Sequence, residues 1–155
     1  MCRNFLREAI RLSREKMLAG DGGPFGAVVV QDKRIIGSGW NCVTSTNDPT
    51  AHAEMVAIRQ ACSRLGTFSL AGCELFASCE PCPMCLAAAY WARIGKLYYA
   101  ATREDAAEAG FDDSRLYDEI ALPAERRSIV AINDLRPEAL AAFDAWRAKA
   151  DRIGY

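Results

Sequence analysis

The chain has 155 residues, a formal net charge of −1, 51% hydrophobic residues and 25% charged residues. This is an ordinary composition for one globular domain, here residues 1–155. A pI of about 5.9 argues against a nucleic-acid-binding protein, because such domains usually carry a basic surface. No apolar run reaches the roughly 18 residues of a membrane span, and the amino terminus lacks a signal-peptide core. We therefore expect a cytoplasmic protein with no nucleic-acid or membrane partner.

The first forty residues predict a helix followed by a hairpin. Apolar residues recur at helical spacing over residues 5–17, and Gly20 is the expected stop. Residues 25–30 are almost continuously apolar, as in a strand buried on both faces. Asp32-Lys33 is the expected tight connection to a partner strand over residues 34–40. We expect residues 41–49 to form a polar loop.

The middle of the chain predicts alternating helices and strands. A strong helical pattern runs from about residue 52 to Gly66, with Thr50 or Asp48 as its expected cap. Residues 72–78 predict a short strand. Pro81 is expected in the first turn of the next helix, where its missing N–H costs nothing. That helix should end near residue 93, and residues 96–101 predict another strand.

The last third of the chain predicts mostly helix. We expect a polar helix over residues 102–108, a short helical turn around Leu116-Tyr117, a last strand over residues 128–132 and an amphipathic helix that begins at Pro137. An opening hairpin followed by strand–helix alternation is typical of an α/β fold. The predicted fold is therefore a three-layer α/β/α domain with a mixed central sheet.

Two short motifs combine the residue types of a hydrolytic zinc site. His52-Ala53-Glu54 supplies an imidazole and a carboxylate, and Pro81-Cys82-Pro83-Met84-Cys85 supplies two thiols at positions i and i+3. Zinc sites that catalyse hydrolysis use three protein ligands and keep a fourth position for water. The pattern H-x-E…P-C-x-x-C is a known signature of zinc nucleobase deaminases. His52 is the only histidine of the chain, so a histidine ligand must be this residue.

A structural or redox interpretation of the same cysteines is also open. Cys79-Glu80-Pro81-Cys82 is a second C-x-x-C pattern, so Cys79 could complete a closed Cys₃His site without an open position. Two observations argue against it. Cys79 falls at the end of a predicted strand, before the proline-led helix, and a closed site has no need of Glu54.

The motifs resemble those of the cytidine-deaminase-like zinc hydrolases, and more narrowly those of the bacterial guanine deaminases of that fold. The resemblance covers nearly the whole chain and is weakest over residues 129–152. The matching segments are residues 22–28, Asn41, 47–54, 78–85, 90–93 and 105–113. Residues 109–113, Ala-Gly-Phe-Asp-Asp, and the terminal Tyr155 match the guanine branch.

The resemblance implies a set of roles for the residues that match. His52, Cys82 and Cys85 would bind one Zn²⁺ per subunit. Glu54 would transfer the protons of the reaction, and Asp113 would contact guanine and assist proton transfer. The implied reaction is the hydrolysis of guanine to xanthine and ammonia.

The remaining implied roles concern the purine base and the assembly. Phe25 would pack on the ring, Asn41 would hydrogen-bond it, and Ala53 and Trp91 would contact it. In the family, the carboxy-terminal segment, here about residues 128–155, is exchanged within a homodimer, so that Tyr155 would cap the partner's site. Residues 152–154 differ from the charged stretch expected before that tyrosine.

Each of these side chains also has an ordinary structural interpretation. Phe25 and Trp91 could be core residues, Asp113 a helix cap and Asn41 a turn residue. Three other functions compete with guanine hydrolysis. They are hydrolysis of guanosine or an aminotriazine such as ammeline on the same scaffold, tRNA adenosine deamination, and a non-catalytic zinc-stabilised domain.

Overall fold

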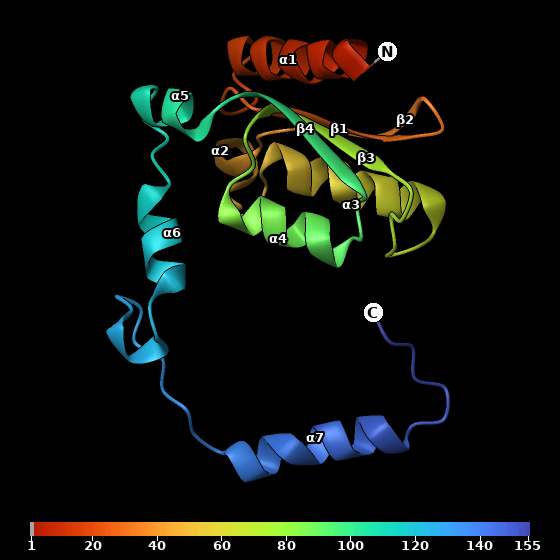
Figure 1. The fold of residues 1–155 in the computed structure, drawn as a ribbon, viewed down its shortest axis with the longest axis vertical. Helices are drawn as coiled ribbons and strands as arrows, with labels where there is room; N and C mark the ends of the chain where they lie inside the picture. Colours follow the sequence, from red (N-terminus) through yellow and green to blue (C-terminus); the bar gives the residue numbers. More distant parts are fainter. Residues whose placement is uncertain (1) are drawn as a thin grey trace. The chain divides into compact units, whose positions relative to one another are not determined.

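A computed structural model describes residues 2–155. These residues form two compact units, and the boundary along the chain lies between Asp113 and Ser114. The predicted α/β architecture is confirmed in the amino-terminal unit (Figure 1). Its elements are α1 (Cys2–Leu18), β1 (Gly26–Gln31), β2 (Arg34–Trp40), α2 (Val43–Thr46), α3 (Ala53–Leu65), β3 (Glu74–Cys79), α4 (Pro83–Trp91), β4 (Lys96–Ala101) and α5 (Arg103–Glu108).

The four strands form a mixed sheet in the order β2-β1-β3-β4. β1 pairs antiparallel with both β2 and β3, whereas β3 and β4 are parallel and are connected through α4. Asp32 and Lys33 at the hairpin turn both have positive φ, 48° and 63°, as a two-residue turn that follows the strand twist requires. The connection predicted for these two residues is confirmed.

Alternate residues of β1 enter the cores on the two faces of the sheet. Val28 and Val30 pack with Phe76 and residues of α1. Ala27 and Val29 pack on the other face with residues of α3 and α4. The four residues from Ala27 to Val30 are all buried, so the predicted strand with two buried faces is confirmed. Helix α1 lies on one side of the sheet, and α3 and α4 lie on the other (Figure 1).

Two glycines in β2 bring α3 close to the sheet. A Cβ atom at Gly37 would lie 2.3 Å from the carbonyl oxygen of Ala57, and one at Gly39 would lie 2.2 Å from that of Ala53. Both distances are far inside van der Waals contact. The absence of these side chains therefore sets the position of α3, whose first turn carries part of the predicted metal motif.

Two local predictions in this unit are wrong. Neither Asp48 nor Thr50 caps α3, because Asp48 Oδ1 accepts hydrogen bonds from the backbone N and the Oγ1 of Thr50, at 2.8 and 2.7 Å, and the cap position is His52. Pro81 is not in the first turn of α4, which begins at Pro83 after Cys82 as cap. The expected loop at residues 41–49 also contains the single-turn helix α2.

The carboxy-terminal unit is described by itself. It contains α6 (Ser114–Ala121), the short 3₁₀ helix η1 (Ala124–Arg126) and α7 (Arg136–Ala148). The strand predicted over residues 128–132 is wrong. Ile129 and Val130 are 81% and 80% exposed, and β-branched residues favour a strand only where a neighbouring strand or core receives them. No helix among residues 2–155 is long and apolar enough to cross a membrane.

Candidate metal centre and base-binding cavity

The structure brings together the three predicted metal ligands. His52, Cys82 and Cys85 place one ligand atom each within 4.8 Å of the others. The Nδ1 atom of His52 lies 3.5 Å from Cys82 Sγ and 3.6 Å from Cys85 Sγ. Two thiols and an imidazole are the soft and borderline donors that zinc prefers.

The distances fit a tetrahedral zinc ion. Zn–S bonds of about 2.3 Å and Zn–N bonds of about 2.0–2.1 Å, at the tetrahedral angle, hold the sulfur and nitrogen about 3.6 Å apart. Both nitrogen–sulfur distances agree with this value. The residues present therefore fit zinc, with His52 binding through Nδ1.

The ligands are positioned by the starts of two helices. His52 is the cap residue of α3, with extended backbone at φ −68° and ψ 156°, and Cys82 is the cap residue of α4, at φ −62° and ψ 168°. The free N–H groups and partial positive charge at a helix start favour negative ligands such as thiolates. Cys85 follows on the same face of α4 and is fully buried.

The ligand side chains also interact with one another. A hydrogen bond with Cys85 and another with His52 lower the pKa of Cys82 to about 4. The bond with Cys82, reinforced by burial, raises the pKa of Cys85. The bond with Cys82 also raises the pKa of His52. The cluster therefore holds one thiolate readily, which is the form that binds metal.

The closed Cys₃His alternative is not formed. Cys79 is not part of the ligand cluster, and its Sγ atom donates instead to the carbonyl oxygen of Thr102 at 3.4 Å. Burial raises the pKa of this thiol to about 11. With three protein ligands, the fourth position of a tetrahedral ion stays open to a small molecule.

Glu54 lies in the first turn of α3, two residues after the cap residue His52, and is 7% exposed. Burial, as the largest cause, raises the pKa of its carboxyl group above the ordinary value. A buried carboxyl group with a raised pKa is suited to accept and return a proton near neutral pH. It lines the same cavity as His52 and Cys82.

That cavity, which we call the base cavity, has a volume of about 100 Å³. It lies within the amino-terminal unit and adjoins the metal ligands. Its lining combines acids, an amide, a guanidinium and two aromatic rings. The lining residues are Phe25, Asn41, His52, Glu54, Cys79, Glu80, Cys82, Arg103, Ala106, Phe111 and Asp113.

Asn41 holds two loops at the cavity wall. It is 8% exposed, and its Oδ1 atom accepts hydrogen bonds from the backbone N–H groups of Gly23 and Val43, at 3.3 and 3.2 Å. Because the carbonyl side of the amide is used by the loops, Nδ2 is the group that it can offer to a ligand, as a donor.

A further polar group of the base cavity is Asp113, at the end of the amino-terminal unit. Burial and the negative charge of Cys82 raise the pKa of its carboxyl group, and Arg103 partly offsets this effect. The position of Arg103 is set by Glu80, whose Oε2 atom accepts from the Arg103 backbone N–H at 3.2 Å. This bond connects the loop before α4 to the start of α5.

Two predicted substrate residues of the amino-terminal unit do not line the base cavity, and a third belongs to the other unit. Ala53 is completely buried beneath β2. Trp91 is the last residue of α4 and is 67% exposed. Tyr155 is the terminal residue of the other unit and is 76% exposed. Their roles toward a substrate stay predictions.

Several lining residues were not predicted as site residues. Cys79 and Glu80 stand next to the metal motif, so proximity in sequence was a usable signal. Phe111 stands two residues before Asp113, in the stretch that carried the family resemblance. Ala106 lies in the same matching segment, residues 105–113. Arg103 carries no sequence signal, because only the packing of α5 brings it to the cavity.

Comparison with known proteins agrees with this geometry. Residues 2–101 match the family "cytidine and deoxycytidylate deaminase zinc-binding region". The chain is 55% identical to guanine deaminase from Bacillus subtilis over 97% of both chains. The X-ray structure of guanine deaminase from that organism superposes with a TM-score of 0.96, at 54% identity, over 99% of this chain and 98% of the other.

A more distant relative has a different activity. The chain is 44% identical to the tRNA-specific adenosine deaminase of Aquifex aeolicus, over 63% of this chain and 64% of the relative. The similarity to that protein omits more than a third of each chain. The family match over residues 2–101 and the ligand geometry agree. The chain therefore belongs to the cytidine and deoxycytidylate deaminase family of zinc-binding proteins.

Proposed function

We infer that this protein is a zinc-dependent hydrolytic deaminase that converts guanine and water to xanthine and ammonia. The observation that carries the reaction type is the open three-ligand set with the buried Glu54 beside it. The full-length similarity to a guanine deaminase supports the choice of guanine.

Zinc, when held by His52, Cys82 and Cys85, supplies Lewis-acid activation of a water molecule. Glu54 takes one proton from the water as its oxygen attacks C2 of guanine, and it gives that proton to the ring nitrogen N3. It then takes the second proton from the hydroxyl group now on C2 and gives it to the amine, which leaves as ammonia while the C2 carbonyl forms. Burial raises the pKa of this carboxyl group above its ordinary value, which favours its protonated form and so its role as proton donor as well as acceptor.

The cavity walls complement the polar edges of guanine. Asn41 donates from Nδ2 to a ring acceptor, since its Oδ1 is already used. Asp113 accepts from the N–H groups of the base. Phe25, which also lines the cavity, offers an aromatic surface to the flat ring. This division of donor and acceptor is what fixes one orientation of the base.

A substrate panel tests the proposal. We expect the zinc-loaded protein to release ammonia from guanine faster than from guanosine, adenine, cytosine, cytidine or ammeline. If guanosine or ammeline reacts faster than guanine, that compound is the substrate, and the fold and metal centre of the account stay the same. Activity only on a tRNA anticodon arm would favour the tRNA deaminase alternative. No ammonia from any of them would favour a non-catalytic zinc-stabilised domain.

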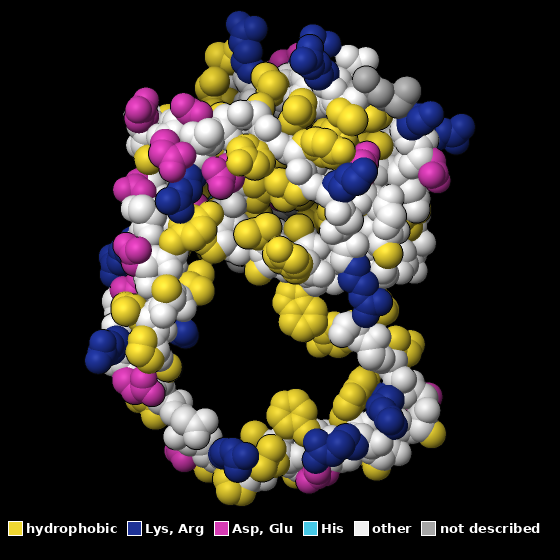
Figure 2. Space-filling model, viewed as in Figure 1, with side chains coloured by type: hydrophobic (Ala, Val, Ile, Leu, Met, Phe, Trp, Pro, Cys, Tyr) yellow, Lys and Arg dark blue, Asp and Glu magenta, His cyan; other side chains and the backbone are white. Residues whose placement is uncertain are grey.

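We propose that the carboxy-terminal segment caps the site of a second copy, in a homodimer. Apolar side chains are exposed along this unit (Figure 2). Ile129, Val130 and Ile132 are each at least 80% exposed, and Phe143 is 60% exposed. Large apolar side chains exposed in this number usually pack against another surface. The resemblance that places Tyr155 over the partner's site is consistent with this.

Mixing two inactive variants distinguishes capping between copies from capping within one chain. A variant truncated after residue 150 has an intact Glu54 but lacks the tail, and it should bind zinc normally yet turn over poorly. Full-length Glu54→Gln has the tail but lacks the proton-transfer group. Co-refolded mixtures should regain activity if the tail acts on the partner's site. If they remain inactive while mixed dimers form, the tail acts within its own chain.

We further propose a cytoplasmic role in purine breakdown. Guanine released from nucleic acids and nucleotides would be its substrate. The seven cysteines are free, and two of them must remain thiols to bind zinc. A reducing compartment preserves such thiols. Location of a tagged full-length chain by cell fractionation would test this proposal.

A further inference from the structure

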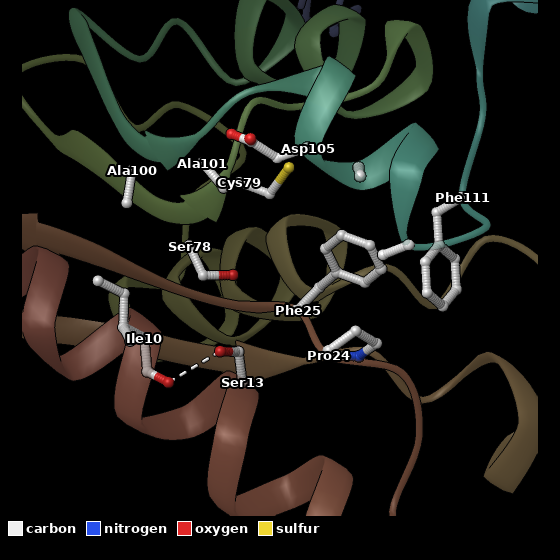
Figure 3. A pocket seen from close by; sticks show the side chains of 12 residues that line it. Ile10, Ser13, Pro24, Phe25, Ser78, Cys79, Ala100, Ala101, Asp105 and Phe111 are labelled. Carbon is white, nitrogen blue, oxygen red and sulfur yellow. Dashed lines mark hydrogen bonds between the residues drawn. The ribbon is translucent and has the colours of Figure 1, made fainter.

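A second cavity, whose lining residues are drawn in Figure 3, adjoins the base cavity within the amino-terminal unit. Its volume is about 370 Å³, which is within the range of small-molecule pockets, roughly 300–1,000 Å³. We call it the side cavity. It is lined by Ile10, Ser13, Pro24, Phe25, Ser78, Cys79, Ala100, Ala101, Asp105, Ala106, Ala109 and Phe111.

The polar groups of the side cavity already have partners. Ser13 Oγ donates to the Ile10 carbonyl oxygen at 2.8 Å, and Ser78 Oγ accepts from Gly26 N at 3.0 Å. Asp105 accepts from the backbone N and the Oγ1 of Thr102 at the start of α5. Most of the other lining residues are apolar, namely Ile10, Pro24, Phe25, Ala100, Ala101, Ala106, Ala109 and Phe111. The side cavity therefore suits a hydrocarbon group.

The two cavities share one wall, made by Phe25, Cys79, Ala106 and Phe111. Phe25 and Phe111 are its largest side chains, and their rings meet edge to face, with centroids 4.9 Å apart at 88° (Figure 3). Hydrogen bonds fix the backbone of both residues. Phe25 O accepts from Asn41 N at 3.0 Å, and Phe111 N donates to Ala106 O at 2.9 Å.

We propose that the Phe25–Phe111 pair is the element that restricts the substrate to a free purine base. The proposal rests on the function proposed above. In guanine the amine leaves from C2, so the five-membered ring lies at the end of the base remote from the metal. A substituent on that ring lengthens the molecule, and the aromatic pair is the largest part of the wall between the base cavity and the side cavity. Removing the Phe111 ring joins the two spaces.

The test uses guanine and its 7-, 8- and 9-butyl derivatives with the zinc-loaded full-length protein. The variants are Phe111→Ala, the milder Phe111→Val and Phe111→Trp. Phe68→Ala is the matched control, because Phe68 is 48% exposed against 45% for Phe111 and lines neither cavity. The readouts are kcat/KM for each compound relative to guanine, and the calorimetric affinity of each compound, which does not depend on turnover.

We expect Phe111→Ala to raise the relative kcat/KM and affinity of at least one butyl derivative by about tenfold or more, the size of effect that one or more methylene groups have in an apolar pocket. Phe111→Val should give a smaller gain, and Phe111→Trp and Phe68→Ala none. The proposal is overturned if the folded alanine and valine variants discriminate against all three derivatives as strongly as the wild type does. Failure of the wild type to hydrolyse guanine would instead refute the proposed function. The calorimetric affinities would still test whether the Phe25–Phe111 pair excludes the butyl derivatives.

Discussion

Replacement of Glu54 by glutamine should abolish most of the activity and leave the metal centre intact. Glutamine has the same shape as glutamate but cannot accept a proton at neutral pH. Glu54 is buried beside the ligand cluster, and the cluster itself consists of His52, Cys82 and Cys85. The change therefore separates proton transfer from metal binding.

The expected loss follows from the role of the carboxyl group. Positioned general acid–base groups usually contribute about 10²- to 10⁴-fold to a rate. At about 1.36 kcal/mol for each factor of ten, this range corresponds to roughly 2.7–5.5 kcal/mol of activation free energy. Because Glu54 acts at both proton transfers, we expect a loss toward the upper end of this range. The loss should appear in kcat.

The assay is ammonia release from guanine under saturating conditions, together with zinc content and far-ultraviolet circular dichroism. Glu74→Gln is a matched control, since Glu74 begins β3 at the end remote from Cys79 and bonds to Tyr98 at 3.3 Å. Glu54→Gln should retain one zinc per chain, and the control should retain full activity. A Glu54→Gln protein that turns over guanine at the wild-type rate would refute the assignment of Glu54.

Three further substitutions test other parts of the site. Cys85→Ser should lose zinc after dialysis against a weak chelator, as measured by metal analysis. If the variant keeps one zinc per chain, Cys85 is not a metal ligand. Asp113→Asn should lower kcat/KM for guanine by about 10- to 100-fold, the value of a hydrogen bond to a charged group, with unchanged zinc content; wild-type kinetics would contradict its contact with the base. Gly39→Ala should lower the free energy of unfolding by about 1–3 kcal/mol through overpacking against α3, measured by urea titration, whereas Gly95→Ala, whose nearest contact would be 3.9 Å away, should not.

The metal centre could be predicted from sequence because its parts are local. His52 and Glu54 are two residues apart, and Cys82 and Cys85 share one turn of helix. Each pair needs only the start of its own helix to be positioned correctly. The one long-range requirement, that both helix starts meet at the same side of the sheet, follows from the α/β architecture that the hydrophobic pattern predicted.

The helix caps illustrate where local rules fail. Asp48 and Thr50 are good capping residues by type, but they bond to each other. His52 occupies the cap position without capping the helix through its side chain. Its imidazole faces the two cysteines. A functional ligand has here displaced the residue type that stability alone would favour.

The cavity walls could be predicted only in part. Phe25 and Asn41 flank β1 and β2, so the hairpin places them near the metal motif. Phe111 and Arg103 reach the cavity through the turn that follows β4 and through the bond between Glu80 and the start of α5. That geometry depends on tertiary packing. The false strand over residues 128–132 has a related cause, because its apolar residues have no pairing partner within the unit.

The central claim is that the protein hydrolyses guanine at C2 with oxygen taken from water. Incubation of the zinc-loaded protein with guanine in ¹⁸O-labelled water, followed by mass spectrometry, measures this directly. The account predicts equal amounts of xanthine and ammonia, with one labelled oxygen in each xanthine molecule. Unchanged guanine, or xanthine without the label, would contradict it.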